Sequence, residues 1–181
     1  VCAYNGGTLE NLTVAGSIEA KDFAAGIFAA SLPMKEEDET LSKLVNHAKV
    51  TADGTAAGIV AQTKEKVLLE DCVNTGVIEA AVAAGITTAE CENLVLMRCQ
   101  NYAPIISSDN ESYGITSNLT ANLTDCVGVS ENVYPIAADA NESENCLYFI
   151  SGGEKLEDAL LADICDISLT IGETDANGSY R

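Results

Sequence analysis

An internal repeat constrains the fold of this chain more than any other feature of its sequence. A similar stretch of sequence that begins with a leucine recurs at intervals of 27 to 33 residues along the 181-residue chain. A second motif, AAGI, follows each of the first three leucines, and a variant, SYGI, follows the fourth. A period of this length is typical of solenoids, in which each repeat forms one coil. The six leucines are Leu9, Leu41, Leu69, Leu96, Leu123 and Leu156.

Within each unit the residues favour strands over helices. The stretch from Val77 to Ala89 is rich in alanine, and its propensity alone would predict a helix. The two units in register with it carry glycine, β-branched residues and an Asp-Gly turn signal, and the three should share one structure. We therefore predict an all-β fold, a right-handed parallel β-helix of about six irregular coils, that spans residues 1–181 as a single segment.

The aligned repeats predict columns of equivalent residues on neighbouring rungs, about 4.8 Å apart. Asn46, Asn74 and Asn101 form one such column, in which the side-chain amides can hydrogen-bond along the axis. Three apolar columns are expected to face inward: Leu12, Leu44, Cys72, Cys99 and Cys126; Ile18, Val50, Ile78 and Ile105; and Ile27, Ile59, Ile86, Ile115 and Leu147. An outward column alternates in charge, which relieves repulsion between rungs: Lys43, Asp71, Arg98 and Asp125.

Insertions mark the expected loops and the ends of the stack. Residues 32–40 lengthen the first full coil, and residues 138–144 form a second insertion loop that enlarges the same corner as residues 107–112. A solenoid needs its open ends covered, and the sequence shows no clear cap unless Glu154 to Ile164 fold as a short amphipathic helix near the C-terminus. Without another cap, and with a chain that begins in mid-repeat, we expect a segment excised from a longer protein.

The charge of the chain excludes several classes of partner. Nine Lys and Arg against 28 Asp and Glu give a formal charge of −19 and a pI near 4.1. Nucleic acid binding needs a basic surface that so few cations cannot form. Docking on anionic lipid is disfavoured for the same reason. Since no apolar run approaches the roughly 20 residues of a membrane span, we expect no membrane insertion either.

An acidic corner is the candidate binding site, because two insertions on consecutive coils would bring oxygen-rich loops together. Such loops can hold Ca²⁺, although the spacing is not that of an EF-hand, and plain solvated turns are the alternative. Apart from Ca²⁺ at this corner, we predict no cofactor and no metal site. The candidate residues are Asp109, Asn110, Glu111, Asp139, Asn141, Glu142 and Glu144.

Catalytic patterns are missing from the sequence. His47 is the only histidine, so no HExxH zinc motif can be drawn. Glu19 and Glu79 fall two rungs apart, near the separation of an inverting glycosidase pair, but no aromatic platform accompanies them. The cysteines show no CxxC spacing, and those in the inward column are expected to be buried hydrophobes, with a disulfide between rungs as the alternative. We predict no catalytic residues and no enzyme activity.

The pattern L-x-x-C-x-N-x-G-x-I-x-A followed by AAGI resembles the GLUG-type repeats of bacterial surface proteins. The likeness is strongest from Gly7 to Gly85. Such repeats occur in adhesins and beside the catalytic part of immunoglobulin-A-cleaving metallopeptidases. The resemblance implies a non-catalytic, extracellular module of a secreted or surface protein that serves adhesion, recognition or spacing. A host glycan or protein is then the expected partner. The alternative is an accessory substrate-recognition region of a larger secreted peptidase or carbohydrate-active enzyme.

Overall fold

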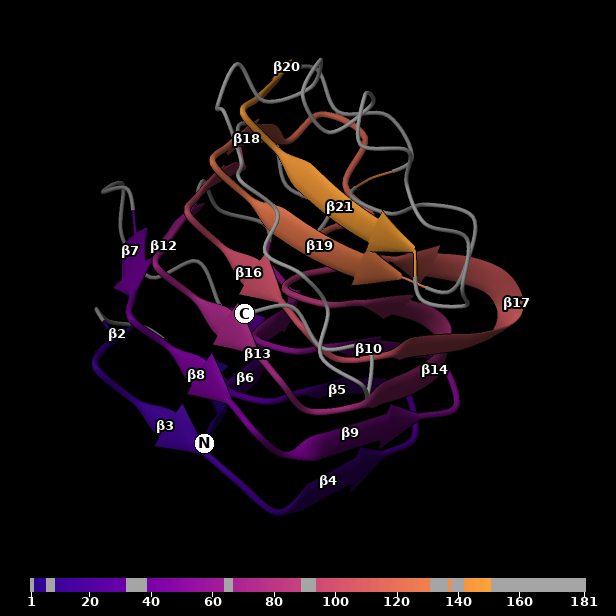
Figure 1. Ribbon diagram of the computed structural model, residues 1–181. Helices are drawn as coiled ribbons and strands as arrows, with labels where there is room; N and C mark the ends of the chain where they lie inside the picture. The colour runs from indigo at the N-terminus through magenta and orange to yellow at the C-terminus, as the bar shows by residue number, and fades with distance from the viewer. Residues whose placement is uncertain are drawn as a thin grey trace, which may run out of the picture.

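In the computed structural model, every element of the described residues is a β-strand, and the strands stack into a parallel β-solenoid (Figure 1). The structure describes residues 2–5, 9–31, 39–63, 67–88, 94–130, 137 and 142–150. The expectations for residues 32–38 and 138–141 and for the helix at Glu154 to Ile164 lie outside these residues. The predicted all-β parallel β-helix is confirmed for the described part of the chain.

Four parallel sheets make up the faces of the solenoid. The leucine sheet is β2 (Leu9–Glu10), β7 (Glu39–Ser42), β12 (Val67–Glu70), β15 (Val95–Met97), β18 (Asn122–Thr124) and β20 (Glu142–Glu144). The asparagine sheet is β3 (Thr13–Val14), β8 (Val45–Asn46), β13 (Val73–Asn74), β16 (Gln100–Asn101), β19 (Val127–Ser130) and β21 (Leu147–Ile150). The broad sheet is β4 (Ser17–Ala20), β9 (Lys49–Ala52), β14 (Ile78–Ala84), β10 (Thr55–Ala57), β5 (Phe23–Ala25) and β17 (Ile105–Tyr113). The short sheet is β1 (Cys2–Asn5), β6 (Phe28–Ser31) and β11 (Val60–Gln62).

The alanine-rich stretch is a strand, as the repeat predicts against its local propensity. β14 runs from Ile78 to Ala84 and pairs in parallel with β9, β10 and β17. Its side chains alternate so that Ile78 and Ala80 are buried while Glu79 is half-buried. Hydrogen bonds to rungs on both sides outweigh the preference of alanine for helix, because a helix here would leave those rungs without their ladder partners.

The last described coil is shorter than the repeat predicts. Leu123 pairs with Ser143 rather than with a residue near Leu156, so this coil spans 143 − 123 = 20 residues. In consequence Leu147 pairs with Val127 in the asparagine sheet and does not join the isoleucine column, where the sequence placed it. The second insertion is also smaller than expected, because 142–144 form β20. The described residues make about four turns, slightly fewer than the six or so coils predicted for the whole chain.

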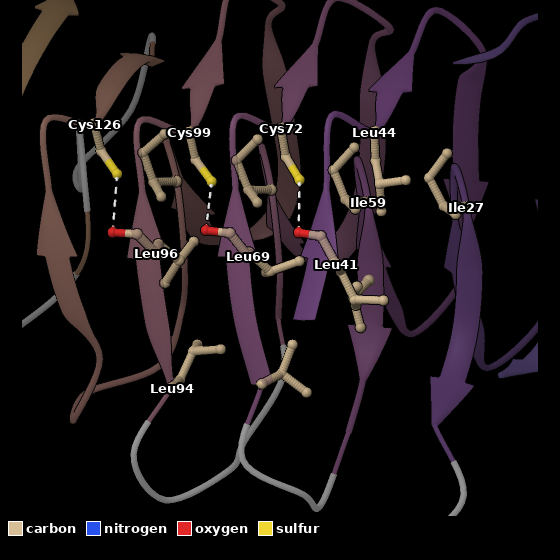
Figure 2. Close-up of a cluster of buried hydrophobic side chains, with 14 of the residues drawn as sticks. Ile27, Leu41, Leu44, Ile59, Leu69, Cys72, Leu94, Leu96, Cys99 and Cys126 are labelled. Atoms are coloured by element: carbon tan, nitrogen blue, oxygen red, sulfur yellow. Dashed lines mark hydrogen bonds between the residues drawn. The ribbon is translucent and has the colours of Figure 1, made fainter. Parts of the chain in front are cut away.

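The other predicted columns fill the core (Figure 2). Ile27, Ile59, Ile86 and Ile115 are fully buried, as is Phe28 beside them. The leucines that open the repeat also point inward, and Leu41, Leu69 and Leu96 are inaccessible to solvent. On the first rung the equivalent side chains, Leu9, Leu12 and Ile18, are partly exposed. Stacking therefore buries each coil against its neighbours, as a solenoid requires.

A buried ladder of asparagines runs beside this core, as predicted. Asn46 Nδ2 donates to Asn74 Oδ1 at 2.8 Å, and Asn74 Nδ2 donates to Asn101 Oδ1 at 2.8 Å. Each Nδ2 also donates to the backbone carbonyl two residues further along, at 2.9 to 3.0 Å. All three side chains are inaccessible to solvent. Each amide group thus hydrogen-bonds both to the next asparagine and to a backbone carbonyl of the corner that follows its strand.

The ladder explains why the repeat keeps a glycine in AAGI. A Cβ on Gly58 would lie 2.0 Å from the carbonyl oxygen of Gly85 and 2.6 Å from Cγ of Asn74. Gly26 and Gly85 face the ladder in the same way. No side chain fits in that space, so the glycine and the asparagine of each repeat depend on one another.

The outward charged column occupies a strained corner. Its residues take the left-handed backbone conformation, which costs most side chains roughly 1 kcal/mol or more and which Asn and Asp tolerate best. The same conformation on every rung gives the chain its turn between the leucine and asparagine sheets. This corner column consists of Asn11, Lys43, Asp71, Arg98, Asp125 and Asn145, with φ between 52° and 56°.

Candidate functional site

The first half of the predicted acidic corner is a bulge in β17 on the broad sheet. Ala80 pairs with Ser107 and Val82 with Glu111, so β17 carries two extra residues at this point. Ser107 organises the bulge, because its Oγ accepts hydrogen bonds from the backbone N–H of Asp109 (3.1 Å) and Glu111 (2.9 Å) and donates one to the Ala81 carbonyl. The side chains of residues 109–111 are all exposed.

The second half of the acidic corner lies on another face. Glu142 and Glu144 belong to β20, which pairs with β18 at the end of the leucine sheet, whereas the bulge protrudes from the broad sheet (Figure 1). Glu144 is exposed. Asp139 and Asn141 lie outside the described residues. The described structure therefore does not bring the two halves together, since the shortened last coil returns the chain to the leucine sheet.

Metal coordination by several side chains is not built into the described part of the chain. No group of three or more His, Cys, Asp or Glu side chains is arranged there to hold a metal ion. The exposed Asn110 takes a left-handed conformation with a φ of 61° at the tip of the bulge, which fits a solvated turn. The Ca²⁺ alternative stays a prediction.

The carboxylates Glu19 and Glu79 have the register that the sequence predicts. Both pair with Thr51, which separates them on the outer face of the broad sheet. Glu79 is not left free, because its Oε2 lies 2.7 Å from Nζ of Lys49. This contact is an ion pair between neighbouring rungs of the broad sheet.

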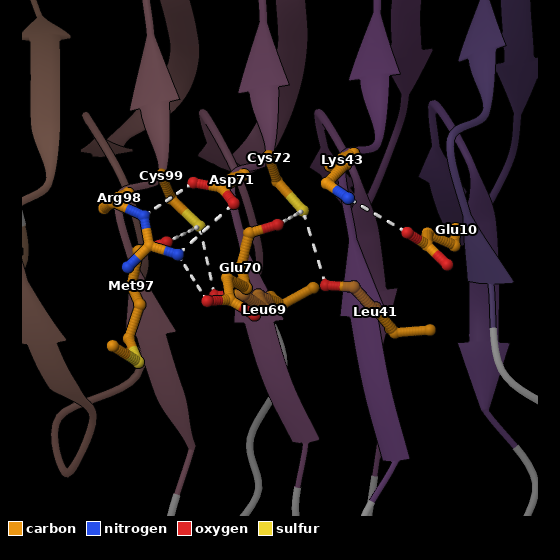
Figure 3. A network of polar contacts seen from close by, with 10 residues as sticks. All are labelled: Glu10, Leu41, Lys43, Leu69, Glu70, Asp71, Cys72, Met97, Arg98 and Cys99. Carbon is orange, nitrogen blue, oxygen red and sulfur yellow. Dashed lines mark hydrogen bonds and ion pairs between the residues drawn. The ribbon is translucent and has the colours of Figure 1, made fainter.

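Ion pairs also connect the rungs along the corner column (Figure 3). Arg98 Nε lies 2.7 Å from Oδ1 of Asp71, and its guanidinium also binds Glu70 on the same neighbouring rung. Lys43 Nζ lies 3.0 Å from Oε1 of Glu10. Of the contacts expected within the corner column, Arg98 with Asp71 is formed. Lys43 instead pairs with Glu10, which lies in the leucine sheet on the preceding rung.

These contacts shift the titration of the acids. The hydrogen bond from the Arg98 guanidinium lowers the pKa of Asp71, with a smaller contribution from the charge of Lys43. The hydrogen bond from Lys43 lowers the pKa of Glu10 in the same way. Both acids are therefore held ionised by partners on a neighbouring rung.

A column of free thiols follows the corner column, each thiol one residue further along the chain (Figure 2). Cys72, Cys99 and Cys126 are inaccessible to solvent, as the repeat predicts, and each thiol donates to a leucine carbonyl of the preceding rung at 3.4 to 3.7 Å. Cys146 extends this column, because Val127 pairs with Leu147 and so sets Cys126 beside Cys146. The repeat alignment missed Cys146, and the Asn-Cys pair at 145–146 was the signal that could have found it.

Comparisons with protein-family models, with curated proteins and with solved structures gave no match. The described part of the chain contains no helix with the length and hydropathy needed to span a bilayer.

Proposed function

We propose that this chain is a non-catalytic, extracellular rod of a bacterial surface or secreted protein, serving as an adhesion, recognition or spacer module. The proposal rests on one observation, that the polar side chains of this chain make their contacts between neighbouring rungs. The asparagine ladder and three ion-pair clusters all join one rung to the next, so polar side chains of successive coils act to keep the stack straight and in register. A rigid body of this kind suits presentation of a surface or separation of two parts. The likeness to GLUG-type repeats supports the extracellular setting.

The outer face of the broad sheet is the surface that we propose for recognition. Phe23 is 42% exposed and Ile106 is 47% exposed, each on a strand of this sheet. Both stand beside hydroxyl and carboxylate side chains, since Phe23 pairs with Thr55 and Ile106 with Glu79. Exposed apolar side chains among polar ones match the composition of interaction surfaces, and a host glycan or protein is the partner class that we propose.

Binding arrays of glycans and of host proteins test this proposal. We expect the chain to retain at least one ligand, and Phe23→Ser together with Ile106→Ser to abolish that binding. Leu119→Ser is the matched control, because Leu119 is 58% exposed but lies outside the broad sheet. Release of product from any arrayed polysaccharide or protein would contradict the non-catalytic assignment. Equal loss of binding in the control would contradict the assignment of the face.

A further inference from the structure

The cysteine column is the feature of the core that packing alone does not require. The same position is filled by Leu12 and Leu44 on the first two rungs, so a leucine fits there. From the third rung onward the position is Cys72, Cys99, Cys126 and then Cys146. Four thiols therefore stand on four consecutive rungs, one above the other.

The spacing of the rungs decides what two neighbouring thiols can do. In-register parallel strands hold equivalent side chains about 4.8 Å apart. A disulfide needs its Cβ atoms about 3.5 to 4.5 Å apart and converging, which stacked parallel side chains do not provide. Two thiolates about 4.8 Å apart match twice a metal–sulfur bond of about 2.3 Å. A cation midway between two rungs would reach both sulfurs in a nearly straight line.

The thiol at the C-terminal end of the column is the most accessible of the four. Cys146 is half-buried, whereas Cys72, Cys99 and Cys126 are inaccessible to solvent. A ligand that enters from solvent therefore meets Cys146 first and Cys126 directly behind it.

We propose that Cys126 and Cys146 form a two-coordinate site for a thiophilic monovalent cation of the Cu(I) class. Soft thiolate ligands select Cu(I), and this d¹⁰ ion accepts two sulfurs in a linear arrangement. On binding, each thiol releases its proton to water and forms a bond from sulfur to copper, and the copper stays in the Cu(I) state. Zn²⁺ is the wrong ion for this pair, because it needs about four ligands in a tetrahedron.

Alkylation of the intact chain tests the site without any substitution. The chain is incubated with Ag(I), a redox-inert analogue of Cu(I), or with Zn²⁺, then treated with N-ethylmaleimide and analysed by peptide mass spectrometry. We expect Ag(I) to protect Cys146 from alkylation and Zn²⁺ to leave it reactive. Alkylation of Cys146 at the same rate with and without Ag(I) would overturn the proposal.

Anaerobic titration with Cu(I) against a competing chelator measures the site itself. We expect Cys146→Ala to bind one fewer Cu(I) per chain than the native protein, and Cys126→Ala to match it. Cys72→Ala is the control, because Cys72 belongs to the same column but lies two rungs from the pair. X-ray absorption should give two sulfur neighbours per copper. An equal loss in Cys72→Ala, or four sulfurs around the metal, would contradict the two-coordinate site. Far-UV circular dichroism verifies that each variant is folded.

Discussion

At the scale of the residue, Ser112 places a hydroxyl group in a core column that alanine fills on the preceding rungs. It is inaccessible to solvent, and its Oγ has no hydrogen-bond partner. The equivalent residues on the preceding rungs are Ala24, Ala56 and Ala83, all buried. A buried hydroxyl without a partner costs about 1 to 3 kcal/mol, because it loses its hydrogen bonds to water.

Replacing that hydroxyl should stabilise the protein. We expect Ser112→Ala to raise the free energy of unfolding by about 1 kcal/mol, since alanine already fits this column on the other rungs. Urea titration followed by circular dichroism measures the change. Ser17→Ala is the control, because Ser17 is exposed on the first rung and its change should stay within about 0.5 kcal/mol. A destabilised Ser112→Ala would show that the hydroxyl has an unseen partner.

Lys43 allows a second test at the scale of the residue, because its backbone takes a left-handed conformation. Its φ of 54° is a conformation that Asn adopts readily, and Asn11 and Asn145 occupy the same column at its two ends. We expect Lys43→Asn to raise the urea midpoint, because the gain in backbone preference exceeds the loss of an exposed ion pair with Glu10. Lys43→Ala removes the same ion pair without the gain and should lower the midpoint. Equal midpoints for the two variants would contradict the argument.

At the scale of the element, the corner column couples stability to pH. The pKa of Asp71 is lower in the folded protein than its ordinary value of 3.8, because Arg98 donates to its carboxylate. Below that value the unfolded chain binds the proton more readily than the folded one, so stability present above about pH 4 is lost as the pH falls further. We expect the urea midpoint to drop through this range. The drop should be smaller in Asp71→Asn.

Arg98→Gln provides an independent approach to the same contact. It leaves the carboxylate of Asp71 in place but removes the donor that lowers its pKa. Its acid transition should therefore be shallower, like that of Asp71→Asn. Since the Asp71 side chain is 39% exposed, added salt should reduce the difference between variant and native protein. A native-like pH profile in both variants would assign the acid transition to other carboxylates.

Elements that follow the period of the repeat were predictable from the sequence, and elements that depart from this period were not. A fixed period places Ile27 above Ile59 and Asn46 above Asn74 without any knowledge of their contacts, because stacking puts equivalent positions together. The last coil escaped because its AAGI motif is worn away. Its register is set by a left-handed corner at Asn145, and the Asn145-Cys146 pair is the sign of that corner in the sequence.

The candidate acidic site was predictable only in part for the same reason. The bulge at Ser107 to Glu111 follows from an insertion relative to β14, which the alignment of repeats does reveal. The bulge would lie beside Glu142 and Glu144 only if a full-length coil separated them, and that coil is short. An insertion can be located by counting residues, but the sheet that receives the next strand depends on backbone conformation.

At the scale of the whole molecule, the paired strands of the described residues join each rung to its neighbours, so stability should pass from each rung to the next. Asn74 stands at the centre of the ladder and bonds both neighbours. We expect Asn74→Ala to cost about 2 to 4 kcal/mol, because it leaves two buried amides short of a partner and opens space beside Gly58. Urea titration measures this loss.

Hydrogen exchange should then show how far the damage spreads. In a stack whose coils support one another in series, Asn74→Ala should lower the protection of backbone amides on the rungs of both Asn46 and Asn101. Val14→Ala is the matched control, since Val14 occupies the same column on the first rung and has only one neighbour. Its effect should fade within the first coils, because the rungs beyond them keep both partners. If Asn74→Ala lowered protection on its own rung alone, the coils would be independent units, and a rigid rod would need another source of continuity.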